Sequence, residues 1–203
     1  MKITIISGST RVESRSAKVA GFIQASLEGQ LGQNVYLLDL AKTPLKYWDE
    51  TFWSNHAEFD STWNEVRQHI IDSDALVVVA PEWNGMIPPA LKNFFHLAVK
   101  GEIANKPGLL VSVSAGINGV YPITELRLNS YKNTFLCYIP QHVIVRNAGN
   151  VLNDLNMPSD KEDEEIRQRI LYSLNVLVEY AKAFCLIRKS DIILNNNKYP
   201  NGM

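Results

Sequence analysis

The chain alternates short apolar runs with longer segments in which apolar residues recur every three or four positions. The apolar runs cover residues 3–6, 35–38, 75–80, 109–113 and 142–145. Runs of this length that are rich in β-branched residues indicate strands buried on both faces. The pattern therefore predicts five strands of a parallel sheet.

Helical spacing of apolar residues marks the intervening segments and the segment after the last strand. Ser159 and Glu162 form a capping-box pattern at the start of the last helix, which we expect to end near Phe184. The helical groups are Val19, Phe22, Ile23 and Leu27; Trp63, Val66, Ile70 and Ile71; residues 88–99; residues 123–132; and Ile166, Ile170, Leu174, Leu177 and Ala181.

Strands that alternate with helices predict an α/β fold with helices on both faces of the sheet. We expect a flavodoxin-like, doubly wound, five-stranded parallel sheet of order 2-1-3-4-5 in a three-layer α/β/α arrangement. In this order the loops after strands one and three diverge and open a crevice at the carboxyl ends of the strands. The domain is expected to cover residues 1–185, and residues 186–203 are expected to form a polar, Asn-rich tail.

The composition argues against nucleic acid and membranes as binding partners. The 203 residues are 46% hydrophobic and 20% charged, with a formal net charge of −1. This near-neutral balance gives no field that would attract nucleic acid or an anionic membrane. The start of the chain lacks a signal-peptide core, and we expect no segment of membrane-spanning length. The distant Cys137 and Cys185 fit a reducing compartment, so a cytoplasmic location is expected.

The histidines do not indicate a catalytic or metal site. His56, His69, His96 and His142 belong to no recognisable triad or metal-ligand motif. We therefore predict no metal and no catalytic side chain, and regard the histidines as surface or structural residues. His96 is the best exception because of its position after the second loop described below.

The first loop, after strand one, carries groups that bind phosphate. Ser9, Ser14 and Ser16 offer hydroxyls, and Arg11 and Arg15 offer two guanidinium groups just before a predicted helix. The residues match neither G-x-G-x-x-G nor the P-loop motif, which argues against a dinucleotide fold of the Rossmann type and against a P-loop NTPase. The alternative is a polar turn with an ordinary helix cap.

Two further loops follow the third and fourth strands. The second, at Pro81, Glu82, Trp83, Asn84 and Gly85, places an aromatic side chain and exposed backbone amides where a flat ligand could bind. Trp83 could equally be a core residue. The third loop, with Ser114, Ala115, Gly116 and Gly119, is also typical of any glycine-rich turn between a strand and a helix.

These loops together resemble the NADPH-dependent FMN reductases, a family that includes quinone, azo-dye and chromate reductases. The motif G-S-x-R-x-x-S is matched by Gly8, Ser9, Arg11 and Ser14, and P-E-Y-N-x-x-x-P-x-x-L-K-N by Pro81, Glu82, Trp83, Asn84, Pro88, Leu91, Lys92 and Asn93. Three residues depart from the usual pattern: Trp83 replaces tyrosine, Ala115 a glycine, and His96 an acidic residue.

The resemblance implies an enzyme that passes electrons from NADPH or NADH through bound FMN to a small-molecule acceptor: a quinone, azo compound, flavin or metal oxyanion. The phosphate is expected on Ser9, Arg11, Ser14 and Ser16. The flavin ring is expected on Pro81, Glu82, Trp83, Asn84 and Gly85 and on Ser114, Ala115, Gly116 and Gly119. The alternative is a flavodoxin-like electron-transfer or flavin-binding module without NAD(P)H turnover.

Two expectations concern surfaces beside this site. Met86 and Ile87 are predicted to form, with Gly85, an apolar wall for substrates, and His96 is a further substrate-binding candidate. Residues 41–58 form a loop that is rich in aromatic side chains, with Tyr47, Trp48, Phe52 and Trp53. Such a loop either packs on its own domain or meets a partner, and we expect a homodimer or homotetramer.

Overall fold

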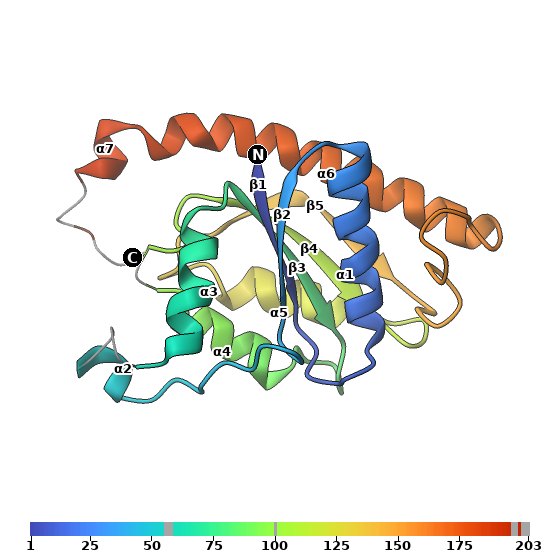
Figure 1. Ribbon diagram of the computed structural model, residues 1–203, viewed down its shortest axis with the longest axis horizontal. Helices are drawn as coiled ribbons and strands as arrows, with labels where there is room; N and C mark the ends of the chain where they lie inside the picture. Colours follow the sequence, from blue (N-terminus) through green and yellow to red (C-terminus); the bar gives the residue numbers. More distant parts are fainter. Residues whose placement is uncertain (55–58, 100, 196–198, 200–203) are drawn as a thin grey trace.

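The computed structural model describes residues 1–54, 59–99, 101–195 and 199, and shows a five-stranded parallel sheet (Figure 1). The strand order is β2-β1-β3-β4-β5, which confirms the predicted flavodoxin-like topology. The strands are β1 (Lys2–Ser7), β2 (Asn34–Asp39), β3 (Ala75–Pro81), β4 (Pro107–Val113) and β5 (Cys137–Val145).

The register of the central strands explains why their sequences are apolar without alternation. Ile5 of β1 pairs with Val77 of β3, which pairs with Leu109 of β4, and these three side chains point to one face. The next residue of each strand points to the opposite face, and both faces are covered by helices. Burial on both faces therefore favours apolar residues at most positions of these strands; Thr4, Ser7 and Ser112 are buried polar exceptions.

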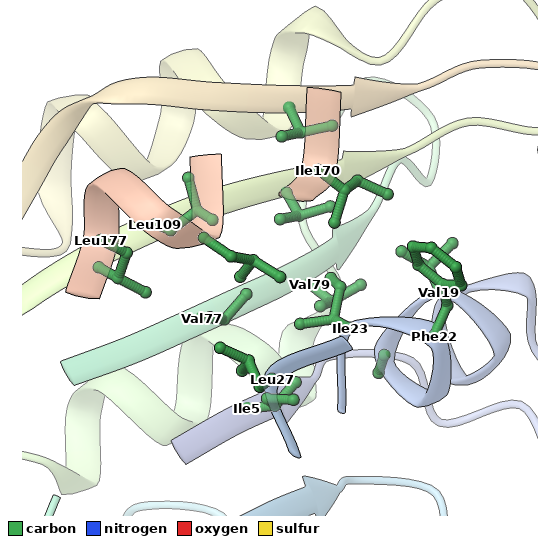
Figure 2. Packing of buried hydrophobic residues seen from close by; sticks show 14 of the residues in the cluster. Ile5, Val19, Phe22, Ile23, Leu27, Val77, Val79, Leu109, Ile170 and Leu177 are labelled. Atoms are coloured by element: carbon green, nitrogen blue, oxygen red, sulfur yellow. The ribbon is translucent and has the colours of Figure 1, made fainter. Parts of the chain in front are cut away.

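One face is covered by α1 (Arg15–Ala25) and α6 (Lys161–Arg188). Figure 2 shows Val19, Phe22 and Ile23 of α1 and Ile170 and Leu177 of α6 directed towards the strand residues of this face. A π-helical turn, η1 (Ser26–Gln30), continues α1.

The other face is covered by α3 (Ser61–Ile71), α4 (Pro89–Leu97) and α5 (Val120–Asn129) (Figure 1). Trp63, Phe94 and Leu126, one from each helix, are fully buried in this layer. The resulting three layers leave the carboxyl ends of the strands and the loops that follow them at one edge of the molecule.

Several element boundaries differ from the sequence expectations. The strand β5 begins at Cys137, five residues before the expected start, because its edge position tolerates the exposed Pro140 and the polar Gln141 that interrupt the apolar run. The predicted loop 41–58 contains a short helix, α2 (Thr51–Ser54); residues 55–58, with His56, lie outside the described residues. Helix α5 begins three residues earlier than expected, directly after Gly119.

The start of α6 is capped differently from the prediction. Asp160, not Ser159, is the N-cap, and its side chain accepts a hydrogen bond from the amide of Asp163. The carboxylate of Asp163 in turn accepts from the amides of Ser159 and Leu152. The expected Glu162 takes no part in these cap bonds, because the helix starts one residue later than the motif suggested.

The length of α6 also differs from expectation. It continues to Arg188, so residue 185, where we expected the domain to end, lies within the helix; α7 (Asp191–Leu194) follows. By length and composition α6 could cross a membrane, although we expected no segment of that length. One side of it is buried against the sheet, as in a core helix. Of the Asn-rich tail, residues 196–198 and 200–203 lie outside the described residues.

Candidate functional site

A cavity of about 440 Å³ opens at the carboxyl ends of β1, β3 and β4. Its walls come from the first, second and third loops, as the strand order predicts for a crevice of this fold. The lining residues are Ser9, Arg11, Glu13, Ser14, Arg15, Ser16, Pro81, Glu82, Trp83, Val113 and Ala115.

The first loop is arranged to present hydrogen-bond donors to this cavity. The hydroxyl of Ser9 accepts from the amide of Arg11 (3.2 Å), and the hydroxyl of Ser14, the N-cap of α1, accepts from the amide of Ala17 (3.0 Å). Because a hydroxyl that accepts a hydrogen bond still has its own hydrogen to donate, both serines can bind an anion. The positive end of the α1 dipole lies at the same place.

Gly8 allows the first loop to pass close to β3 and α4. Its amide donates to the carbonyl of Val79 on the neighbouring strand (2.9 Å), and a Cβ atom at this position would lie 2.7 Å from Cδ2 of Leu91. A side chain therefore does not fit, and the chain passes directly over β3 and α4 before it turns into the cavity. This close approach is the physical reason for a glycine in the motif.

Arg15 and Glu13 also line the cavity, although neither was among the residues expected to hold the cofactor. Arg15 is the first residue of α1, and its guanidinium group lies over Gly149, where a Cβ would come within 3.1 Å of Nη2. The sequence signal for Arg15 was its place at a predicted helix N-terminus, within the loop expected to bind phosphate. Arg15 adds a second guanidinium group to the one expected from Arg11.

The second loop is a tight hairpin. The amide of Trp83 donates to the carbonyl of Met86 (2.9 Å), and the amide of Met86 donates back (3.0 Å). Between them, Asn84 and Gly85 both have positive φ, at 51° and 76°. This is the conformation of a type I′ turn, for which Asn-Gly is the preferred pair. The Asn-Gly dipeptide was the signal that could have predicted it.

A carboxylate joins the second and third loops. Oε2 of Glu82 accepts a hydrogen bond of 2.6 Å from the amide of Gly119, which has a φ of 108°. Within the third loop, the hydroxyl of Ser114 accepts from the amide of Gly116 (3.3 Å). Arg146 of the following loop donates to the carbonyls of Ile117 and Asn118. The third loop is therefore fixed from both sides.

The structure does not bring all the sequence-predicted residues to one cavity. Asn84, Gly85, Ser114, Gly116 and Gly119 lie in the flanking loops but do not line the cavity. Met86 is 55% exposed, whereas Ile87 is only 5% exposed. Ile87 and His96 line a different cavity of about 370 Å³ beside α4. The expected apolar wall of Gly85, Met86 and Ile87 is thus divided, because the hairpin turns Ile87 towards the core.

The comparison with known proteins agrees with this geometry. The family model described as NADPH-dependent FMN reductase matches residues 1–150. The chain belongs to this family of NADPH-dependent FMN reductases. The reductase is therefore a flavoenzyme whose cofactor is FMN.

Individual relatives are more distant. The reductase is 23% identical over 189 residues to an NADPH azoreductase of Bacillus sp., and the match covers 93% of this chain and 97% of that one. It is 30% identical over 124 residues to a quinone reductase of Pseudomonas putida, covering 58% and 62% of the two chains. FerB of Paracoccus denitrificans, a flavoenzyme NAD(P)H:(acceptor) oxidoreductase, superposes with a TM-score of 0.73 at 18% identity over 90% of this chain and 98% of that one.

The donor set of the cavity fits a phosphate monoester such as that of FMN. Hydroxyl and guanidinium groups are the side chains that bind phosphate oxygens in a directional manner, and the N-terminus of α1 adds a favourable dipole. Pro81, Trp83 and Val113 give the cavity a partly apolar wall against which a tricyclic ring can pack. The cavity thus combines a polar and an apolar lining, which is chemically compatible with a phosphate and a ring.

Proposed function

We propose that this reductase holds the FMN phosphate with Ser9, Arg11, Ser14, Ser16 and the additional Arg15. We further propose that the flavin ring lies against Pro81, Glu82, Trp83, Asn84 and Gly85 on one side and Ser114, Ala115, Gly116 and Gly119 on the other. The observation that carries this proposal is one cavity in which phosphate donors and an aromatic hairpin meet. Bound FMN would supply the redox chemistry, namely hydride acceptance from a nicotinamide and electron transfer to an oxidised acceptor.

The protein's own part is to bind and orient. Glu82 keeps the second and third loops together through the amide of Gly119, so their backbone groups face the ring from fixed positions. The exposed side chain of Met86 leaves an open apolar side next to the hairpin. A planar molecule can stack there without specific hydrogen bonds, which favours a broad range of acceptors.

We propose quinones and azo compounds as the first acceptors to test, since relatives are named for these substrates. Flavins and metal oxyanions are further candidates, and NADPH or NADH is the donor. The test is the oxidation of NADPH by the purified protein with a quinone, with and without added FMN, together with a visible spectrum. A protein that binds flavin but does not oxidise NADPH would favour the electron-transfer module instead.

We propose a homodimer, alone or as half of a tetramer. The support is a surface groove of about 560 Å³ beside α4, lined by Tyr47, Trp48, Trp53, Pro89, Lys92, Asn93, His96, Val99 and Asn133. The buried Asn93 accepts from the amide of Trp48 and so fixes the aromatic segment on α4. Large exposed aromatic surfaces of this kind usually meet a partner. A light-scattering mass of 22.9 kDa, that of one chain, would contradict the dimer.

We also propose a cytoplasmic location. Both cysteines are free thiols, and burial raises the pKa of Cys137, which keeps that thiol protonated and unreactive. A protein that needs no disulfide can function in a reducing compartment. Fractionation of cells that express the tagged protein tests this location.

A further inference from the structure

Helix α5 contacts the Trp83–Met86 hairpin at several points. The amide of Gly119, just before the helix, donates to Glu82 at the start of the hairpin (2.6 Å). The amide of Ile87, at the other end of the hairpin, donates to Oε2 of Glu125 on α5 (2.8 Å). Between them, a Cβ on Gly85 would lie 3.8 Å from the ring of Tyr121, also on α5.

The spacing of these α5 residues explains how one helix reaches both the tip and the end of the hairpin. Tyr121 and Glu125 are separated by four positions, which places their side chains on the same face of a helix. Tyr121 therefore covers the turn while Glu125 holds the residue that follows it. The hairpin is fixed at both ends by a carboxylate and an amide.

Glu125 is itself held by a second partner. Its Oε1 lies 2.5 Å from Nζ of Lys92 on α4, and the Glu125 side chain is 17% exposed. Because α4 begins directly after the hairpin, this ion pair closes a ring that joins the hairpin, α4 and α5. A carboxylate suits the position because its two oxygens accept from two different donors, an amide and an ammonium group.

We propose that Glu125 is a positioning residue for the flavin site, which acts by fixing the hairpin whose backbone faces the ring. This inference rests on the proposed function of the hairpin. Without the Ile87–Glu125 bond the hairpin keeps the Glu82 attachment at its first end, while its second strand retains the packing of the buried Ile87 but loses the hydrogen bond that fixes its end. Flavin binding then has to order that strand, and the ordering lowers the affinity.

The test compares Glu125→Ala, Glu125→Gln and the control Glu179→Ala. Glu179 is an exposed carboxylate of α6 that pairs with Lys182. Two quantities are measured: the exchange rate of the Ile87 amide in the FMN-free protein by NMR, and the dissociation constant of FMN by flavin fluorescence. The exchange rate reports the hairpin bond directly and does not depend on turnover.

We expect both quantities to rise about tenfold or more in Glu125→Ala, the range for loss of a hydrogen bond to a charged group. Glu125→Gln keeps one carbonyl oxygen for the Ile87 amide and should restore both to within about threefold of the wild-type values, because the hydrogen bond is retained without the ion pair. The control should match the wild type. If Glu125→Ala fails to fold, Glu125→Asp, which withdraws the carboxylate by one methylene, replaces it with the same expectations.

An unchanged exchange rate, or an unchanged FMN dissociation constant with faster exchange, would overturn the positioning role and leave the proposed function intact. Failure of Glu125→Gln to restore either quantity would also count against the hydrogen bond as the cause. Wild-type protein that binds no FMN would overturn the proposed function and this inference with it. The two failures are therefore distinguishable.

Discussion

A Cβ atom on Gly119 would lie 2.5 Å from Cγ2 of Ile144, so the start of α5 is packed directly against β5. Gly119 also has a φ of 108°, a conformation that residues with a side chain rarely adopt. The close approach lets the amide of Gly119 reach the carboxylate of Glu82. The third loop depends on this contact between a glycine and an isoleucine side chain.

Substitution of Gly119 should therefore be costly. Gly119→Ala is expected to lower the free energy of unfolding by about 2–4 kcal/mol through backbone strain and overpacking. Gly21→Ala is the matched control, since Gly21 lies within α1 and nothing stands within 4 Å of its Cβ position. The control should raise the free energy of unfolding by about 0.5–1 kcal/mol. Urea denaturation followed by circular dichroism measures both, and equal effects would contradict the packing argument.

Removal of the Arg11 guanidinium group should weaken FMN binding. We expect Arg11→Ala to reduce the affinity for FMN by about 1.5–3 kcal/mol, the range for a hydrogen bond to a charged group. Lys182→Ala is the control and should leave the affinity for FMN unchanged. It removes the same charge from the end of α6 near Arg188. Arg188 contacts Asp74 at the amino end of β3, the end opposite the cavity. Equal FMN affinities of Arg11→Ala and wild type in fluorescence titrations would remove the phosphate assignment.

The flavin released from the protein should be FMN and not FAD. Ser9 and Ser16 are almost fully buried, each 1% exposed, and together with Arg11 and Ser14 they line the part of the cavity proposed to hold the phosphate. A terminal monophosphate can use all these donors at once, whereas an adenylate extension would need an exit between them. Chromatography of the flavin after heat denaturation gives the answer, and FAD as the main product would contradict it.

Acid should destabilise the cap of α6 in a defined pH range. Burial alone would raise the pKa of Asp163, but hydrogen bonds from Arg167, Ser159 and Leu152 lower it to about 2. The ionised carboxylate therefore stabilises the fold by about 2 kcal/mol above pH 5, and this contribution disappears as the pH falls from about 4 to 2.

Asp163→Asn tests this prediction. The difference in unfolding free energy between wild type and variant should be largest near neutral pH and should shrink below pH 4. Glu165→Gln, at an exposed position of the same helix, is the control and should show little difference at any pH. A gap between wild type and Asp163→Asn that stays constant down to pH 2 would show that the carboxylate is not responsible.

Steady-state kinetics should follow a ping-pong pattern. The exposed Met86 and Tyr121 leave one open side beside the hairpin, and we expect nicotinamide and acceptor to occupy it in turn. Double-reciprocal plots with quinone varied at several fixed NADPH concentrations should then give parallel lines. Intersecting lines would mean that both substrates bind together and would require a second binding surface.

The sequence by itself determined the three-layer arrangement and indicated that the site lies at the carboxyl ends of the strands. Residues 75–80 are all apolar, and residues 109–113 are apolar except for Ser112, because both faces of the sheet are covered; this regularity is visible without any contact information. The loop with Gly8 and the serines and the loop with Trp83 could be recognised because each directly follows a predicted strand and matches a motif. The fold class could therefore be predicted from local patterns, and the family and cofactor from the resemblance of the loop motifs to a known family.

Only the tertiary structure decided which side chains meet. Glu82 bonds to Gly119 and Glu125 bonds to Ile87, over separations of 37 and 38 residues, and no local preference encodes such a pairing. Arg15 enters the cavity because Ser14 caps α1 and directs its first turn there, whereas the hairpin turns Ile87 away from it. Local preference selects the elements, but the packing of α4 and α5 on the sheet brings distant donors and acceptors together.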